Sequence, residues 1–158
     1  MPYRDSSAIL ENLLEERILI LDGAMGTQIQ ALGFDEQAIR GERFLGHDRD
    51  LKNFADILCL THPAEITDIH RRYLAAGADI VETNTFGASP VGMDEFNLPL
   101  ALVEEINAAA VVCARQACDE YTERNPAKPR FVAGSIGPTT KQTAISTQVD
   151  DPGHRGVT

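Results

Sequence analysis

The fold of this chain is decided by the stretch Ala75-Ala76-Gly77-Ala78-Asp79-Ile80-Val81-Glu82-Thr83-Asn84-Thr85-Phe86. It reads as the end of a helix, a glycine stop, a short apolar strand and four consecutive polar residues. Strands that are buried on both faces appear in sequences as apolar runs. Ligands of α/β folds bind at the C-terminal ends of such strands. We therefore expect chemistry or ligand binding at residues 82–85.

Two further segments repeat this pattern of an apolar strand followed by a polar or glycine-rich turn. They are Ile18-Leu19-Ile20-Leu21 with Asp22-Gly23-Ala24-Met25-Gly26-Thr27, and Phe131-Val132-Ala133 with Gly134-Ser135-Ile136-Gly137-Pro138-Thr139. The spacing of apolar residues and the stop signals predict helices over about residues 8–14, 25–32, 63–76 and 100–123. Strands that alternate with helices are typical of a parallel sheet with crossover helices.

The strand ends favour one α/β architecture over another. The first strand is not followed by the dinucleotide-binding pattern G-x-G-x-x-G, and the chain has no G-x-x-x-x-G-K-[ST] loop. A (β/α)8 TIM barrel fits the polar strand ends better, but such a barrel typically needs about 250 residues. We therefore predict an α/β fold that is the N-terminal part of a TIM barrel, truncated before the barrel closes. Residues 34–53 are polar and mixed in charge, and we predict a long loop there.

The composition narrows the class of protein. The chain of 158 residues is 43% hydrophobic and 24% charged, which is ordinary for a soluble globular protein. It has no apolar run long enough to span a bilayer, and residues 1–5 lack the basic start and apolar core that are typical of a signal peptide. Three cysteines, an odd number, argue against a secreted disulfide framework and predict a cytoplasmic protein. A net charge of −10 without a basic run makes nucleic acid and anionic membranes unexpected partners.

The turn after the first strand is a candidate anion site. Its backbone N–H groups lie where a helix begins, and a helix N-terminus suits an anion such as an amino-acid carboxylate. Asp22 can cap this helix or bind an ammonium group. The alternative is a plain strand-to-helix turn with a capping aspartate, since Asp-Gly is a common turn dipeptide.

The polar cluster after the central strand offers a carboxylate, two hydroxyls and an amide, from Glu82, Thr83, Asn84 and Thr85. Strand alternation points Glu82 and Asn84 to one side and the two threonines to the other. We favour Thr83 facing inward to a ligand. The alternative is that these residues satisfy only each other and the loop backbone. Gly134, after the third strand, would allow a ligand to approach the backbone closely, unless it belongs to a plain loop.

The cysteines and histidines show no metal-binding pattern. Cys59, Cys113 and Cys118 form no C-x-x-C motif, and we expect all three to be buried structural residues. The four histidines have no ligand spacing such as H-E-x-x-H; they are His47, His62, His70 and His154. We therefore assign none of these residues to a metal.

Three motifs taken together resemble one family. Residues 21–30, 76–86 and 131–139, in this order and spacing, are similar to the N-terminal homocysteine-binding domain of cobalamin-dependent methionine synthase. Residues 56–61 and 150–153 also match. The resemblance runs from about Arg17 to Thr158, nearly the whole chain, and leaves residues 1–16 as an N-terminal helix. On this resemblance residues 1–158 are one partial homocysteine-binding barrel domain.

The resemblance implies methyl transfer to homocysteine, which forms methionine. The family domain is a (β/α)8 barrel that binds homocysteine and a zinc ion held by three cysteine thiolates, and the zinc lowers the pKa of the substrate thiol. The methyl group comes from methylcobalamin, which a second barrel reloads from methyltetrahydrofolate. Carried over by motif, the backbone at Asp22, Gly23 and Ala24 would hold the homocysteine carboxylate, and Thr83 would line the pocket. The other possible pocket residues are Glu82, Asn84, Thr85 and Gly134.

The sequence departs from the family at the metal. The family's zinc cysteines lie in a lone-cysteine motif and a Gly-Gly-Cys-Cys motif, and this chain has neither. We therefore transfer no zinc ligation to its cysteines, assign no catalytic residue, and expect zinc and cobalamin only in the full-length enzyme. The expected partners are homocysteine, the rest of the barrel, and the cobalamin and folate modules.

Two alternatives to a cobalamin-dependent enzyme stay open. One is a cobalamin-free homocysteine methyltransferase with an S-methylated sulfonium or betaine donor. The other is a non-catalytic truncated protein that binds an amino acid or serves in assembly. In either case three strands leave sheet edges unpaired and apolar surface uncovered. We therefore expect the isolated chain to be either marginally stable or self-associating. Because the zinc that activates the thiol is missing, we also expect it to be inactive.

Overall fold

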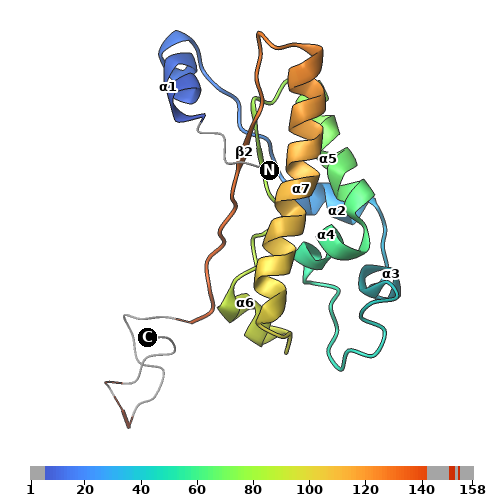
Figure 1. Ribbon diagram of the computed structural model, residues 1–158. Coiled ribbons are helices and arrows are strands. Elements are labelled where there is room, and N and C mark those ends of the chain that lie inside the picture. The colour runs from blue at the N-terminus through green and yellow to red at the C-terminus, as the bar shows by residue number, and fades with distance from the viewer. Residues whose placement is uncertain (1–5, 142–149, 152, 154–158) are drawn as a thin grey trace.

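The computed structural model of the chain describes residues 6–141, 150, 151 and 153. Short helices surround two long ones and a small parallel sheet (Figure 1). The elements in chain order are α1 (Ser7–Glu16), α2 (Met25–Ala31), α3 (Glu36–Arg40), the 3-10 helix η1 (Ala55–Ile57), α4 (Leu58–Thr61), α5 (Pro63–Ala76), β1 (Ile80–Glu82), α6 (Pro90–Glu95), α7 (Ala101–Arg124) and β2 (Phe131–Ala133).

The sheet is parallel and open. β1 pairs with β2, and Val81 lies opposite Val132. On the other edge of β1, Leu21 forms a single parallel bridge with Ile80, and the Ile80 N–H donates to the carbonyl of Ile20 (3.1 Å). The predicted first strand is therefore extended and correctly placed, but it is reduced to one bridge. Ile18 and Ile20 are exposed, because this edge has only one neighbour among the described residues.

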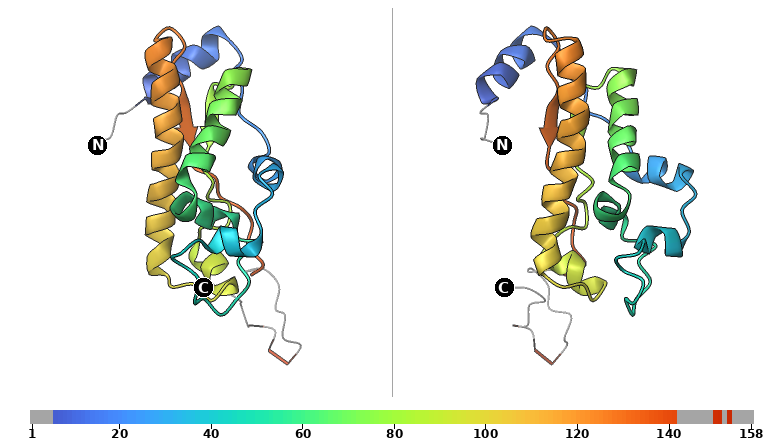
Figure 2. Two further views of the ribbon diagram at one scale, coloured as in Figure 1. Left: turned by 90° about the vertical axis from the view of Figure 1, so that its right-hand side faces the viewer. Right: turned by 45° about the vertical axis from the view of Figure 1, so that its right-hand side comes forward.

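The helices begin and end where the sequence signals predict. Pro63 occupies the first turn of α5, where its missing N–H leaves no unsatisfied donor. Gly77 ends this helix in the left-handed conformation (φ 114°), which glycine adopts without a Cβ clash. α7 follows the predicted long helix, and Figures 1 and 2 show α5 and α7 running side by side along the sheet.

The predicted long excursion or loop over residues 34–53 is mostly turns and irregular structure, but one short helix, which was not predicted, interrupts it. The segment contains α3, which Asp35 caps by accepting a hydrogen bond from the Ala38 N–H (2.7 Å). It also buries Ile39, Phe44 and Leu51 in the core. These apolar residues are five and seven positions apart, so no helical or strand period appears in the sequence. Side-chain hydrogen bonds to the backbone organise the segment instead.

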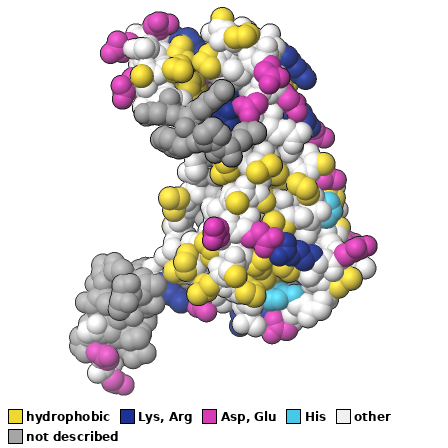
Figure 3. Space-filling view, viewed as in Figure 1, with side chains coloured by type: hydrophobic (Ala, Val, Ile, Leu, Met, Phe, Trp, Pro, Cys, Tyr) yellow, Lys and Arg dark blue, Asp and Glu magenta, His cyan; other side chains and the backbone are white. Residues whose placement is uncertain are grey.

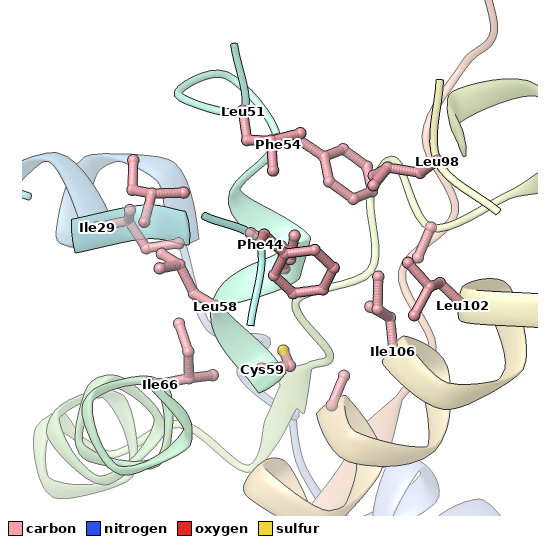
Figure 4. Packing of buried hydrophobic residues seen from close by; sticks show 14 of the residues in the cluster. Ile29, Phe44, Leu51, Phe54, Leu58, Cys59, Ile66, Leu98, Leu102 and Ile106 are labelled. Atoms are coloured by element: carbon pink, nitrogen blue, oxygen red, sulfur yellow. The ribbon is translucent and has the colours of Figure 1, made fainter. Parts of the chain in front are cut away.

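The main part of the core lies among the helices, and a smaller part lies between α5, α7 and the sheet. The main cluster joins α4, α5 and α7 to the segment before η1 (Figure 4), and a smaller cluster packs Leu74 and Val81 against Ala114, Ala117 and Cys118. The apolar run at residues 56–60 is helical, as the end of η1 and the start of α4. Hydrophobic side chains also reach the surface shown in Figure 3. None of the helices in the described part of the chain combines the length and apolarity that a membrane crossing needs.

An ion cluster fastens the N-terminal end of the sheet. The side chain of Asp79, just before β1, is 1% exposed and accepts two hydrogen bonds of 2.9 Å from Arg17. The Ile20 N–H (3.0 Å), Lys128 (3.5 Å) and Arg130 (3.4 Å) complete its surroundings. Burial opposes ionisation of Asp79, but the Arg17 hydrogen bonds and the other partners outweigh it and lower its pKa to about 2.

Candidate functional site

The predicted polar residues meet at the C-terminal ends of the three parallel segments. Asp22 follows Leu21, Thr83 follows β1 and Gly134 follows β2. The carboxylate of Asp22 accepts a hydrogen bond from the Glu82 N–H (3.1 Å). The Thr83 hydroxyl accepts one from the Ser135 N–H (3.1 Å). The structure therefore brings segments that are far apart in the sequence to one edge of the sheet.

Thr83 and Thr85 form a closed ring of hydrogen bonds with Ser135. The Thr85 hydroxyl donates to the Ser135 carbonyl (2.8 Å), so its single proton is used. The Thr83 hydroxyl, 2.7 Å away, must then donate to Thr85, while it accepts from the Ser135 N–H. Both threonines are buried. Thr83 has one lone pair left, so toward a ligand it can act only as an acceptor.

Asn84 points away from the two threonines and fastens the strand end to the helices. Its amide donates to the Ala55 carbonyl (2.8 Å) in η1 and lies 3.7 Å from the sulfur of Cys59 in α4. The Cys59 thiol in turn donates to the Asn84 carbonyl (3.6 Å). The alternative that these polar residues satisfy each other and the backbone therefore describes Thr83, Asn84 and Thr85 well in this structure.

Asp56 supports the loop after β1, a role that the sequence reasoning missed. Its buried carboxylate accepts a hydrogen bond from the Gly87 N–H (2.8 Å). Burial raises the pKa of Asp56, although the backbone hydrogen bonds oppose the shift. The available signal was a carboxylate inside the apolar run of residues 55–60, because a charged side chain is rarely buried without a structural partner.

Asp22 is the carboxylate at this edge with the most perturbed protonation. Burial raises its pKa to about 6, the charge of Glu82 adds to the shift, and the hydrogen bond from the Glu82 N–H opposes it. No Lys or Arg forms an ion pair with Asp22 in the part of the chain that the structure describes. A partly buried carboxylate that titrates near neutrality is typical of functional sites.

The backbone beside Asp22 offers unused donors. The Asp22 N–H itself donates to the Ile80 carbonyl (2.9 Å), so it is not available to a ligand. The next two N–H groups, of Gly23 and Ala24, have no hydrogen-bond partner among the described residues. The Tyr73 hydroxyl donates to the Ala24 carbonyl (3.1 Å) and holds the turn against α5. α2 begins at Met25, so these donors lie at a helix N-terminus.

The two glycines of the third loop differ in their surroundings. Gly134 is exposed, and a Cβ there would meet nothing within 4 Å. A Cβ at Gly137 would lie 2.5 Å from the carbonyl oxygen of Phe86, to which the Gly137 N–H donates (3.0 Å). The close approach that requires a glycine is therefore between the loops after β1 and β2, at Gly137.

A hollow of about 350 Å³ lies beside these loops, lined in part by Asp56, Phe86 and Pro138. A larger one of about 490 Å³ lies on the helix side of the molecule, next to Arg71 and Tyr121. Neither includes Asp22 or Thr83 in its lining, so the carboxylate and the unused backbone donors stand at an open edge.

The cysteines lie in the helical core and not at the strand ends. Cys59, Cys113 and Cys118 are all buried. Within residues 6–141 and the three described positions beyond them, no three His, Cys, Asp or Glu side chains are grouped so that they could hold a metal ion. The three thiols present therefore do not fit a zinc site with three thiolate ligands.

Comparison with known proteins agrees with the sequence resemblance. The sequence profile of the family described as homocysteine S-methyltransferase matches residues 19–156. The oxidised and metallated crystal forms of the homocysteine methyltransferase MmuM from Escherichia coli each match with 30% identity and a TM-score of 0.64, over 82% of this chain. The apo form matches with 28% identity and a TM-score of 0.57, also over 82% of this chain.

The chain covers 40%, 41% and 40% of the oxidised, metallated and apo forms respectively, so it spans about two fifths of the solved structures it matches. It has mixed helices and an open sheet, and it corresponds to part of such an enzyme. Because the profile matches most of its length, the chain belongs to the homocysteine S-methyltransferase family.

Proposed function

We propose that this chain is the N-terminal part of a (β/α)8 homocysteine methyltransferase and that it binds the amino-acid end of homocysteine at the C-terminal edge of its strands. The observation that carries the proposal is the desolvated carboxylate of Asp22 beside two unused backbone donors. The family match supports the substrate. The whole enzyme would transfer a methyl group to homocysteine and form methionine.

The two charged groups of an amino acid complement this edge. The homocysteine carboxylate would accept hydrogen bonds from the N–H groups of Gly23 and Ala24 at the start of α2. The ammonium group would pair with Asp22. An adjacent cation favours the ionised carboxylate, so binding would lower the pKa of Asp22 and offset the unfavourable burial of its charge.

The remaining site residues would act around this contact. Thr83 would line the pocket, and its hydroxyl oxygen could accept one more hydrogen bond from the ligand. Thr85 would hold the Thr83 hydroxyl in place. Asn84 would fix the backbone between them through η1 and α4. For Glu82 and Gly134 we propose only a position in the pocket wall.

Activation of the homocysteine thiol would require residues beyond those of this chain. The family resemblance implies a zinc ion with three thiolates, and the buried cysteines of this chain do not fit that role. We therefore place the metal ligands outside residues 1–158 and expect the isolated chain to bind substrate without catalysing transfer. Three reduced cysteines suit the cytoplasm, where we place the enzyme.

For the methyl donor we favour methylcobalamin, because the three motifs resemble the methionine synthase domain. The runner-up is a cobalamin-free enzyme of the same family with a sulfonium or betaine donor. Both would use the same homocysteine site. Cobalamin- and folate-binding modules in the same polypeptide would decide for the first.

The binding site can be tested by calorimetric titration of homocysteine into a protein that carries this chain and the rest of its barrel. We expect Asp22→Asn to weaken binding by about 10- to 100-fold, the range for losing a charge-assisted hydrogen bond. Asp68→Asn is the matched control, because Asp68 is an exposed carboxylate on α5 paired with Arg71. Equal affinities of the Asp22→Asn variant and the wild type would overturn the proposed ammonium contact.

A further inference from the structure

The side chain of Tyr73 reaches from α5 to the turn of residues 22–24, which follows the first parallel segment. α5 lies beside α2 (Figure 2), and the Tyr73 hydroxyl donates to the Ala24 carbonyl (3.1 Å). A Cβ at Gly23 would lie 3.5 Å from the Tyr73 ring and 3.6 Å from its hydroxyl oxygen, so the ring stands beside this glycine. One side chain therefore supports both residues whose N–H groups have no partner among the described residues.

The turn has few other restraints. Gly23 carries no Cβ, so its backbone has a wide choice of conformations. Ala24 occupies the N-cap of α2, where an alanine side chain cannot accept a hydrogen bond from the helix, and the bond from the Gln28 N–H to its carbonyl is long (3.4 Å). Tyr73 is the only side chain that hydrogen-bonds to Gly23 or Ala24 in the part of the chain that the structure describes.

Tyr73 is itself held firmly. Its side chain is half-buried and packs against the main hydrophobic cluster. Its backbone carbonyl accepts a hydrogen bond from the Ala78 N–H (3.1 Å), where the chain approaches β1. Tyr73 therefore joins the start of β1 to Ala24, which lies 49 positions earlier in the sequence.

We propose that Tyr73 is a positioning residue of the homocysteine site, which holds Gly23 and Ala24 so that their N–H groups meet the substrate carboxylate. This rests on the proposed function, which assigns the turn to the amino-acid end of homocysteine. Tyr73 touches no substrate atom, and its effect passes through the backbone of the turn. Donors that are in place before a ligand arrives bind it more tightly, because binding does not have to order them.

The effect of Tyr73 should be limited to the carboxylate contact. Asp22, the proposed partner of the ammonium group, is fixed by other bonds. Its N–H donates to the Ile80 carbonyl (2.9 Å), and its carboxylate accepts from the Glu82 N–H (3.1 Å). Loss of the Tyr73 hydroxyl should therefore loosen the turn and leave Asp22 in place.

Tyr73→Phe tests the proposal, because it removes the hydroxyl and keeps the ring. Homocysteine is titrated by calorimetry into the protein that carries this chain and the rest of its barrel. We expect the variant to bind about 3- to 10-fold more weakly than the wild type, the range for losing one neutral hydrogen bond. Tyr121→Phe is the matched control and should bind as the wild type does. Tyr121 is a half-buried tyrosine of α7 whose hydroxyl has no hydrogen-bond partner among the described residues.

Amide NMR of the free barrel protein separates positioning of the turn from a general loss of structure. In Tyr73→Phe the amide signals of Gly23 and Ala24 should shift or broaden. The amide signal of Glu82, which bonds to Asp22, should stay unchanged. Because no ligand is present, this measurement does not depend on the proposed function.

Weaker homocysteine binding together with a change confined to the amides of Gly23 and Ala24 would support the proposal. Equal affinities of Tyr73→Phe and the wild type would overturn it. A change of the Glu82 amide as large as that of Gly23 would also overturn it, since Tyr73 would then support the whole strand end. No binding by the wild type would instead refute the proposed function, and the amide signals would still show whether Tyr73 holds the turn.

Discussion

The two ends of the small sheet shift the pKa of a carboxyl group in opposite directions. At the N-terminal end, Asp79 is surrounded by Arg17, Lys128 and Arg130, and its pKa falls to about 2. At the C-terminal end, Asp22 has no such cation among the described residues, and burial raises its pKa to about 6. The first end is completed by the chain itself and stabilises the fold. At the second end the carboxylate has no cation beside it among the described residues, and we propose that a cationic ligand supplies one.

The largest effect on stability should come from removing the charge of Asp79 at the N-terminal end of the sheet. We expect Asp79→Asn to lower the free energy of unfolding by about 3–5 kcal/mol, the range for removing one partner of a buried ion pair. The change leaves the buried Arg130 without the counter-charge of Asp79, and the Nε of Arg130 already has no hydrogen-bond partner among the described residues. Urea unfolding at pH 7 measures the loss. Asp68→Asn, which removes an exposed pair with Arg71, should change the value by less than about 1 kcal/mol. Similar losses in both variants would contradict a special role for Asp79.

His70 shows how burial shifts a pKa when no ion partner is involved. It is fully buried on α5, neither ring nitrogen has a hydrogen-bond partner in the described structure, and burial lowers its pKa from 6.5 to about 4. The folded state therefore binds this proton more weakly than the unfolded chain, so stability falls as the pH drops from 6.5 toward 4.

We expect His70 to account for a loss of about 3 kcal/mol over this pH range, from the size of its pKa shift. Urea unfolding between pH 7 and pH 4 measures it. His70→Leu should flatten this part of the profile while the acid loss that comes from Asp79 below about pH 4 remains. An unchanged profile in His70→Leu would show that burial alone does not shift the histidine.

Asp22→Asn should have the opposite sign to Asp79→Asn. The raised pKa means that the folded protein disfavours ionised Asp22 above pH 6, so removing the charge should stabilise the free protein at pH 7.5. Because Asp22 is partly exposed, we expect a gain of about 1 kcal/mol after screening by solvent. The gain should shrink as the pH falls from 6 to 3.8 and vanish at about pH 3, where Asp22 is protonated in both the folded and the unfolded chain. Thermal unfolding at the two pH values checks the sign, and a loss at pH 7.5 would break the contrast with Asp79.

The smallest effect on stability should come from Gly23→Ala. A Cβ there would lie 3.5 Å from the Tyr73 ring, an ordinary contact, so we expect the free energy of unfolding to change by less than about 0.5 kcal/mol. The methyl group would nevertheless stand beside the proposed carboxylate site, so homocysteine affinity in the whole barrel should fall. Gly137→Ala is the control, since its Cβ would collide with the Phe86 backbone and destabilise the loop. Equal stability losses in the two variants would contradict this assignment.

The sequence was sufficient for features that depend on local signals. The start of α5 at Pro63, its end at Gly77 and the parallel order of the three segments follow from residue types and spacing. α3 was missed because the apolar residues around it are too sparse to show a period. The predicted site residues do meet at one edge, but their partners could not be predicted. The ring of Thr83, Thr85 and Ser135 depends on contacts across 52 positions of the chain.

The central claim is that Asp22, a carboxylate without a cationic partner among the described residues, binds the ammonium group of homocysteine. Its most direct test is the pKa of the Asp22 carboxyl group, followed through the ¹³C NMR shift of its carboxyl carbon. The titration is measured in the barrel protein with and without homocysteine. The account predicts a pKa of about 6 in the free protein, falling to the ordinary value of 3.8 or lower when homocysteine is bound. A pKa near 3.8 in the free protein, or one that homocysteine does not change, would contradict it.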